Sequence, residues 1–315
     1  MSILIAEDNV ARKYYLLIFL LISALFCSSC AIQEVVSQTQ NSSLEKNNVN
    51  EEKLLEEEIL VYKDFQIIRQ VKEEKDEETS KRLNKPVFEK HHYFFIKKDN
   101  KTLKIWDESG FMDSEIKLIS FINKNTKQLW IKLYDSPSKF DVVITLENKP
   151  RVIFDSLNQN EGEMIGGEPI DIDNNNIYEF LENLDVLGCT YTSCAFRKFG
   201  TAIFKYNETE KKLMLANRQF SHFILKDLQR DKKILQKTIV RLNKETKKDS
   251  SQRIVLEEEH LSLVLKIVLD LVFSGKEKEA WMFYDRMCKL NDKEEIKKSL
   301  KKDIEGNDIY KLIYK

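Results

Sequence analysis

Apolar residues follow three different patterns along the chain, and each pattern predicts a different kind of structure. Residues 14–27 are an almost uninterrupted apolar run. From Ile59 to Phe220, β-branched and aromatic residues occur in short segments that polar clusters separate. After Phe220, the apolar residues recur near helical spacing. These patterns predict an α+β protein in which an antiparallel β-rich domain precedes a C-terminal helical segment.

The segments between Ile59 and Phe220 are typical of antiparallel strands. Runs such as VFEKHHYFFIKK and FDVVITLE are rich in residues that favour strands, and clusters such as NKNTK resemble hairpin turns. No helical pattern interrupts the series. We therefore expect a β-rich domain over residues 59–220, built as a sandwich or a partial propeller.

The last part of the chain, residues 221–315, is predicted to be a helical domain. Its central segment predicts two helices that break at Ser274-Gly275, and KEEIKKSLKKDI predicts a further helix. The hairpin resembles a tetratricopeptide unit in outline, with Ala280 and Trp281 in its second helix. Such repeats stabilise one another by stacking and only one unit is visible. We therefore expect a single helical hairpin that packs on the sheet domain.

The first 30 residues have two incompatible interpretations. The segment ILIAEDN resembles the start of receiver domains, in which acidic residues at the end of a strand hold a metal ion. A receiver domain continues with an amphipathic helix, whereas residues 14–27 have no polar face. An apolar run of about 14 residues is shorter than the ~20 residues of a membrane-spanning helix and is typical of a secretory signal. The export interpretation therefore explains more of the segment.

The end of the apolar run favours a lipid anchor. The segment LFCSSC resembles the bacterial lipobox, in which the chain is cut before a cysteine that carries fatty acyl chains. We expect a signal peptide over residues 1–29, lipidation of Cys30, and a flexible tether over residues 30–58 that becomes helical near EEKLLEEEIL. The alternative is an uncleaved single-pass anchor. Both interpretations place the rest of the chain in the bacterial cell envelope, on its periplasmic or outer-membrane face.

Composition limits the classes of partner. Hydrophobic residues make up 42% and charged residues 33% of the sequence, enough for a core under a strongly solvated surface. The formal net charge of −1 creates no global field that attracts nucleic acid. We expect the membrane, through the lipid anchor, and an envelope protein or polymer as partners. The basic run from Lys226 to Lys248 either meets phospholipid headgroups or forms an ordinary solvated helix face.

Three of the five cysteines lie beyond the predicted anchor. In the oxidising envelope, Cys189 and Cys194 of CTYTSC would close a small disulfide and leave Cys288 buried and free. Two alternatives stay open, a zinc site and reduced cysteines that pack as small apolar residues. No second cysteine pair follows that would complete a zinc site.

The most specific polar cluster is EPIDIDNNNIYEF. Asp171, Asp173, Asn175 and Glu179 occupy positions 1, 3, 5 and 9 of a short loop, and Ile177 offers a backbone carbonyl at position 7. Oxygen ligands at this spacing suit Ca²⁺. The alternative is an Asn-rich turn whose acidic residues are only solvated. Calcium is the one cofactor that the sequence predicts.

The order of several segments resembles a family of uncharacterised bacterial envelope lipoproteins. These segments are QLWIKLYD, RVIFDS, PIDIDNNNIYEF, AIFKYN and LMLANRQF, and they cover Gln128 to about Leu225. The Asp-rich loop of that family is similar to the loop of FG-GAP or VCBS repeats. The family usually carries a segment with Gly, His and Cys after the first of these strands, where this chain has SPSKFDVV. The resemblance implies the β-rich fold and the loop, and it implies no activity.

No pattern in the sequence predicts catalytic residues. His91 and His92 are adjacent in a predicted strand, so their side chains point to opposite faces and cannot easily chelate one ion. The usual serine-nucleophile, zinc-protease and phosphate-loop motifs are absent. We expect a cell-envelope lipoprotein with a non-catalytic binding or structural role, stabilised by calcium. The alternatives are a metal-assisted hydrolase that acts on envelope polymers and a single-pass membrane-anchored adaptor.

Overall fold

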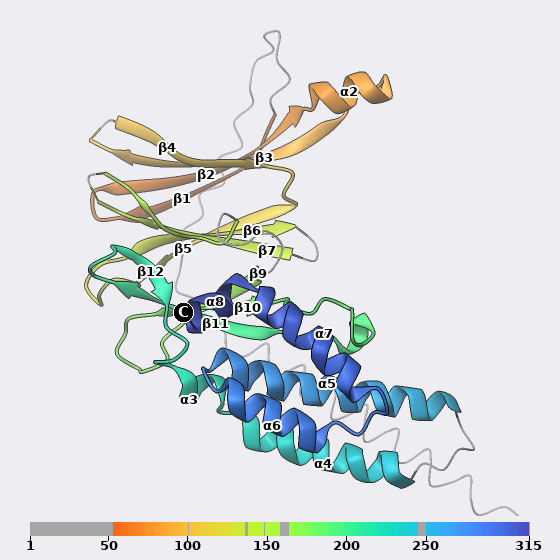
Figure 1. Cartoon of the computed structure of the whole chain (residues 1–315). Helices are drawn as coiled ribbons and strands as arrows, with labels where there is room; N and C mark the ends of the chain where they lie inside the picture. The colour runs from red at the N-terminus through yellow and green to blue at the C-terminus, as the bar shows by residue number, and fades with distance from the viewer. Residues whose placement is uncertain are drawn as a thin grey trace, which may run out of the picture. The chain divides into compact units, whose positions relative to one another are not determined.

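The computed structural model describes residues 53–99, 101–135, 138–147, 149–157, 164–244 and 250–314. In this part of the chain, three antiparallel four-stranded sheets and a group of helices form four successive layers (Figure 1). Each sheet is a meander of four consecutive strands. The predicted α+β class, a β-rich part followed by helices, is confirmed. The predicted signal peptide, Cys30 and the tether up to residue 52 lie outside the described residues.

The first sheet contains one helix that the strand pattern did not predict. Its elements are β1 (Lys53–Tyr62), β2 (Phe65–Lys75), α2 (Glu77–Leu83), β3 (Phe88–Lys98) and β4 (Lys101–Ser109). The side chain of Asp76 caps α2 by accepting a hydrogen bond of 2.9 Å from the Thr79 N–H. Such a cap satisfies one of the free N–H groups at a helix start, which favours the short helix here.

Strand β1 corrects two expectations about the segment EEKLLEEEIL. The segment from Lys53 onward is a strand rather than a helix, and the strand begins before the predicted domain boundary at Ile59. Pairing with β2 runs from Lys53 opposite Glu73 to Tyr62 opposite Phe65. This ladder satisfies the backbone groups of β1 that face β2, and it decides the conformation of a segment that would otherwise favour a helix.

The second sheet is buried on both faces. It consists of β5 (Asp113–Ile119), β6 (Gln128–Asp135), β7 (Ser138–Thr145) and β8 (Val152–Asp155). Along β6, Leu129, Ile131 and Leu133 pack against the first sheet. Trp130, between them, packs against the third sheet. Both sets are buried because neighbouring side chains of a strand point to opposite faces and each face is covered.

The third sheet lies between the second sheet and the helices. It consists of β9 (Met164–Ile170), β10 (Glu179–Leu184), β11 (Gly200–Asn207) and β12 (Lys212–Leu215). Phe180 and Phe204 face the second sheet and contact Phe154, with ring centroids 4.9 and 5.0 Å from it. Ile203 points to the other face and packs against Phe220, next to the first helix of the C-terminal layer. The sheet therefore has one face on each neighbouring layer.

The helical layer contains a long buried helix with shorter helices around it. Its elements are α3 (Ser221–Ile224), α4 (Leu228–Lys244), α5 (Ser250–Phe273), α6 (Glu277–Met287), α7 (Lys293–Gly306) and α8 (Asp308–Tyr314). The predicted break at Ser274-Gly275 falls between α5 and α6, where Gly275 has a φ of +86°. Among the described residues, no helix combines the length and the apolar character needed to cross a bilayer.

Candidate functional site

The predicted calcium loop lies between β9 and β10 and is held by hydrogen bonds within the chain. The Asp171 carboxylate accepts bonds from the Asn175 and Asn176 N–H groups, at 2.9 and 2.8 Å. The Asn175 side-chain oxygen accepts a bond of 2.7 Å from the Ile177 N–H. Asn174 and Asn176 adopt positive φ values of 56° and 64°, which asparagine tolerates better than most residues. Local side-chain-to-backbone bonds therefore set the shape of this loop.

A lysine from β11 supplies a positive charge to the same loop. The Lys205 Nζ lies 3.2 Å from Glu179 Oε1 and 3.6 Å from Asp173 Oδ2. The other carboxylate oxygen of Glu179 accepts a hydrogen bond of 3.2 Å from the Ile172 N–H. Lys205 is partly exposed, while Glu179 is fully buried. Lys205 thus sits between two of the carboxylates that the sequence predicts as calcium ligands.

The pKa of Glu179 reflects a balance between burial and this neighbouring charge. Burial raises the pKa above its usual value, and the Ile172 N–H and Lys205 oppose that effect. The Ile172 N–H and Lys205 therefore both favour the ionised form of this buried carboxylate. Within the described residues, no group of three or more His, Cys, Asp or Glu side chains is arranged to hold a metal ion. Calcium binding at this loop stays a prediction, and Lys205 is the cation that the structure places there.

Lys205 also borders a surface cavity on the third sheet. The cavity has a volume of about 430 Å³ and lies between β11, β12 and α8. Its lining consists of Lys205, Tyr206, Asn207, Met214, Leu215, Ala216, Asn217, Arg218, Gln219, Leu312 and Ile313. These residues include two cations and no acid. Lys205 is already paired with Glu179 and Asp173, so Arg218 is the charge that would attract an anion to this cavity.

Arg218 is the cation of this cavity that has no acidic partner among the described residues. Its guanidinium group lies over the Tyr314 ring, 5.8 Å from the centroid. The Tyr314 hydroxyl in turn donates a bond of 2.7 Å to the Val272 carbonyl. Stacking on a fixed aromatic ring restricts the guanidinium group and leaves its N–H donors available. Met214 and Leu312, 37% and 64% exposed, add apolar surface beside it.

One wall of the cavity is fixed by the buried Asn217. Its side-chain oxygen accepts a bond of 2.6 Å from the Ile203 N–H. Its amide nitrogen donates to the Thr201 and Phe273 carbonyls at 2.8 and 2.9 Å. Asn217 therefore joins β11 to the end of α5, and it holds the adjacent Arg218 at the cavity.

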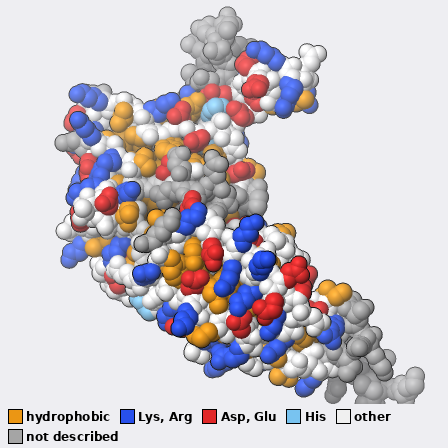
Figure 2. All heavy atoms as spheres, viewed as in Figure 1, with side chains coloured by type: hydrophobic (Ala, Val, Ile, Leu, Met, Phe, Trp, Pro, Cys, Tyr) orange, Lys and Arg blue, Asp and Glu red, His pale blue; other side chains and the backbone are white. Residues whose placement is uncertain are grey.

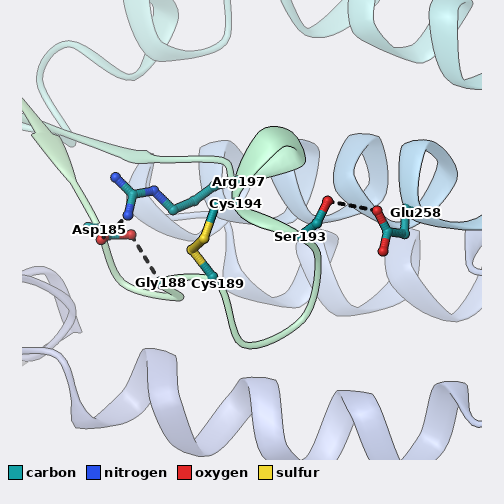
Figure 3. Close-up of a disulfide and its surroundings, with 7 residues drawn as sticks. All are labelled: Asp185, Gly188, Cys189, Ser193, Cys194, Arg197 and Glu258. Atoms are coloured by element: carbon teal, nitrogen blue, oxygen red, sulfur yellow. Dashed lines mark hydrogen bonds and ion pairs between the residues drawn. A yellow bond between two sulfur atoms is a disulfide. The ribbon is translucent and has the colours of Figure 1, made fainter. Parts of the chain in front are cut away.

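Cys189 and Cys194 are joined by a disulfide in the segment between β10 and β11 (Figure 3). Two further contacts hold this segment: Arg197 pairs with Asp185 at 3.1 Å, and the Ser193 hydroxyl donates to Glu258 of α5 at 2.8 Å. Both cysteines are solvent-exposed, whereas Cys288 is a buried free thiol. The disulfide therefore closes a small loop within this surface segment, and the Ser193–Glu258 bond connects the segment to the helical layer.

The two adjacent histidines have different surroundings, as strand alternation predicts. His92 is buried, and its ring nitrogens lie 2.8 Å from Ser114 Oγ and 3.0 Å from the Phe111 carbonyl. Burial lowers its pKa. His91 points to the other face and contacts Glu89 at 3.0 Å. Ser114 also accepts a bond of 2.7 Å from Arg69 Nε, so the group is a packed polar network between the first two sheets.

A second buried charged group was not predicted from the sequence. Lys132, Asp141 and Glu182 lie between the second and third sheets. Lys132 donates to the Gly167 carbonyl at 2.6 Å, and Asp141 accepts from the Gly167 N–H at 3.0 Å. Burial raises the pKa of Asp141 to about 6, and burial and Asp141 raise the pKa of Glu182 strongly. These groups join two sheets, and none of them lines the cavity at Arg218.

The comparisons with known proteins add no relative. A scan against protein-family models, a search of curated proteins and a search of solved structures each find no match. The function of this chain is therefore inferred from its own residues.

The structure connects the predicted loop to residues that sequence reasoning missed. Lys205 and Arg218 were not singled out, because a lysine in a strand and an arginine after it are ordinary surface residues. Lys205 alternates with the buried Phe204 and lies directly opposite Met214 in the sheet. The alternation of Lys205 with the apolar Phe204 could have shown from the sequence that Lys205 lies on the opposite face of the strand. Only the tertiary structure shows that α8 packs beside that position.

Proposed function

We propose that the chain is a cell-envelope lipoprotein that binds a small anionic molecule with an apolar part and does not transform it. The apolar leader and the LFCSSC segment support the lipid anchor at Cys30. The disulfide between the exposed Cys189 and Cys194 supports an oxidising compartment, since such bonds are rare in the cytosol. The proposed ligand would bind in the cavity beside Arg218.

The lining of the cavity indicates the chemistry of the ligand. A carboxylate would meet the Arg218 guanidinium, whose planar array of donors matches a carboxylate better than a single ammonium group does. An alkyl chain would contact Met214, Leu215 and Leu312. A volume of about 430 Å³ is within the usual range for small-molecule sites. We therefore propose a medium-chain alkyl carboxylate as the simplest matching ligand.

Binding of decanoate to the full chain tests this role. We expect decanoate to bind and decanol, which lacks the charge, to bind at least tenfold more weakly by calorimetry. Arg218→Gln should weaken decanoate binding about tenfold and leave decanol binding unchanged. Arg82→Gln is the matched control, because it removes the same charge from an exposed position in α2, distant in sequence from Arg218. Equal binding of both probes, or equal loss in both variants, would contradict the proposal.

The lipid anchor has a separate test. Cells grown with a fatty-acid probe should label the full chain, and Cys30→Ala should abolish the labelling. Persistent labelling of the Cys30→Ala variant would contradict lipidation at this residue. Detection of the uncleaved N-terminus by mass spectrometry would favour the single-pass adaptor instead.

A further inference from the structure

The outward face of α4 carries a row of five cations, Arg230, Lys233, Lys237, Arg241 and Lys244, which we name the basic stripe. They follow one another at intervals of three or four residues, so they share one side of the helix. All five are exposed. At about 1.5 Å per residue, the stripe is roughly 20 Å long.

The opposite side of α4 is the side that packs in the protein. Asp231, Leu235, Thr238 and Leu242 are its buried residues. Thr238 donates a hydrogen bond of 3.0 Å to Glu259 of α5. Figure 1 shows α4 along the border of the helical layer away from the sheets. The basic stripe therefore faces away from the core.

Few acidic side chains neutralise the basic stripe. Arg230 pairs with Asp227 and Asp231, and Arg241 pairs with Glu259. The other three cations of the stripe have no acidic partner in the part of the chain that the structure describes. Over the face shown in Figure 2, by contrast, positive and negative side chains are interspersed. With a net charge of −1 for the whole chain, the stripe is a local concentration of positive charge.

Exposed aliphatic side chains accompany the cations. Ile234 and Val240, on α4, are 40% and 50% exposed. Ile254 and Val255, near the start of the paired helix α5, are 59% and 51% exposed. Cations beside exposed aliphatic side chains are typical of helices that lie at a lipid–water interface. A nucleic-acid partner would bind the cations through its phosphates but would make no favourable contact with the exposed aliphatic side chains.

We propose that this face of α4 docks on a membrane surface rich in anionic phospholipid. The lysines would meet the headgroup phosphates, and Ile234 and Val240 would enter the interface between headgroups and acyl chains. The contact would add a second attachment to the proposed lipid anchor. The docking surface does not depend on the cavity ligand or on lipidation.

Vesicle co-sedimentation of residues 31–315, which lack both the apolar leader and the proposed lipidation site, tests the docking surface. Vesicles of phosphatidylcholine alone are compared with vesicles that contain 30 mol% phosphatidylglycerol. We expect tighter binding to the anionic vesicles, and the difference should shrink as salt rises. The triple variant Lys233→Gln, Lys237→Gln, Lys244→Gln should lose on the order of 100-fold in affinity for them, since each lysine near such a surface contributes roughly fivefold.

Two controls separate lipid docking from other causes. The variant Lys101→Gln, Lys124→Gln, Lys212→Gln loses the same charge from exposed positions in β4, in the β5–β6 connection and in β12, and it should bind like the parent. The variant Ile234→Asn, Val240→Asn keeps every cation and should also bind anionic vesicles more weakly. All variants change exposed residues and should keep the unfolding midpoint of the parent.

Several results would overturn the proposal. These are equal binding to neutral and anionic vesicles, equal losses in the two triple variants, and an unchanged affinity after Ile234→Asn with Val240→Asn. Binding of an oligonucleotide that depends on the basic stripe, without vesicle binding, would also overturn it and would assign the stripe to nucleic acid.

Discussion

Replacing Asn217 by alanine should remove much of the stability of the protein. The residue is 1% exposed, and its side chain makes three hydrogen bonds, with the Ile203 N–H and with the Thr201 and Phe273 carbonyls. Alanine would leave the Ile203 N–H and the Thr201 and Phe273 carbonyls without the hydrogen-bond partner that Asn217 provides in this buried region. At about 1–3 kcal/mol for each unsatisfied group, with some relief from water, we expect a loss of about 3–5 kcal/mol. An ordinary domain has only about 5–15 kcal/mol of stability.

Urea unfolding, followed by circular dichroism and by tryptophan fluorescence, measures this loss. The midpoint should fall while the slope of the transition stays constant, because the substitution changes stability rather than the surface exposed on unfolding. Asn207→Ala is the matched control: Asn207 is exposed, and its side chain caps the turn at the Thr209 and Glu210 N–H groups. This control should lose about 1 kcal/mol or less.

An aspartate at position 217 gives a second measurement of the same effect. Asn217→Asp keeps the acceptor for the Ile203 N–H but places a buried carboxylate against two carbonyl groups. We expect its pKa to be raised, so the folded variant should be most stable in acid and should lose stability as pH rises through that pKa. A loss below 1 kcal/mol for Asn217→Ala, or equal losses for Asn217→Ala and Asn207→Ala, would refute this account of the bonds.

Three further predictions concern the disulfide, the acidic loop and a buried aspartate. Replacing Cys189 and Cys194 by serine should cost about 2 kcal/mol, from the closure of a loop with a sequence separation of 5, and a reductant should lower the unfolding midpoint of the parent only. A calcium chelator should lower the melting midpoint of the parent, and Asp171→Ala with Asp173→Ala should erase the difference; an unchanged midpoint of the parent would contradict calcium binding at the loop. Burial raises the pKa of Asp270 to about 6, so the stability that its protonated form contributes is complete below about pH 4 and is lost as pH rises through 6. Between pH 4 and 8 the parent should therefore lose up to about 3 kcal/mol relative to Asp270→Asn in urea unfolding, and parallel pH profiles would contradict this.

Side-chain alternation was enough to predict the strands and the class of the fold. The runs around His92, Trp130 and Phe204 predict strands, because β-branched and aromatic residues fit a pleated, half-buried surface. The same rule correctly separates His91 from His92. It could not predict that the second sheet is covered on both faces, since Lys132 and Asp141 look like solvent-facing positions in the sequence.

The candidate site was predicted only in part. The spacing of Asp171, Asp173 and Glu179 identifies the loop, because these residues are close in sequence. Lys205 and Arg218 come from other segments, and their role depends on the register of β11 and on the packing of α8. The segment at Lys53 illustrates the same limit, because its residues favour a helix and pairing with β2 makes it a strand.

The sequence by itself therefore determined what local rules control: the succession of strands and helices, the composition of the acidic loop, and the proximity of Cys189 to Cys194. The tertiary structure decided which charges meet, which faces are covered and where the cavity and the basic stripe lie. The physical reason is that periodicity assigns a side chain to a face of its own element. The energy of a charged or polar group depends on the neighbours that other elements bring to it.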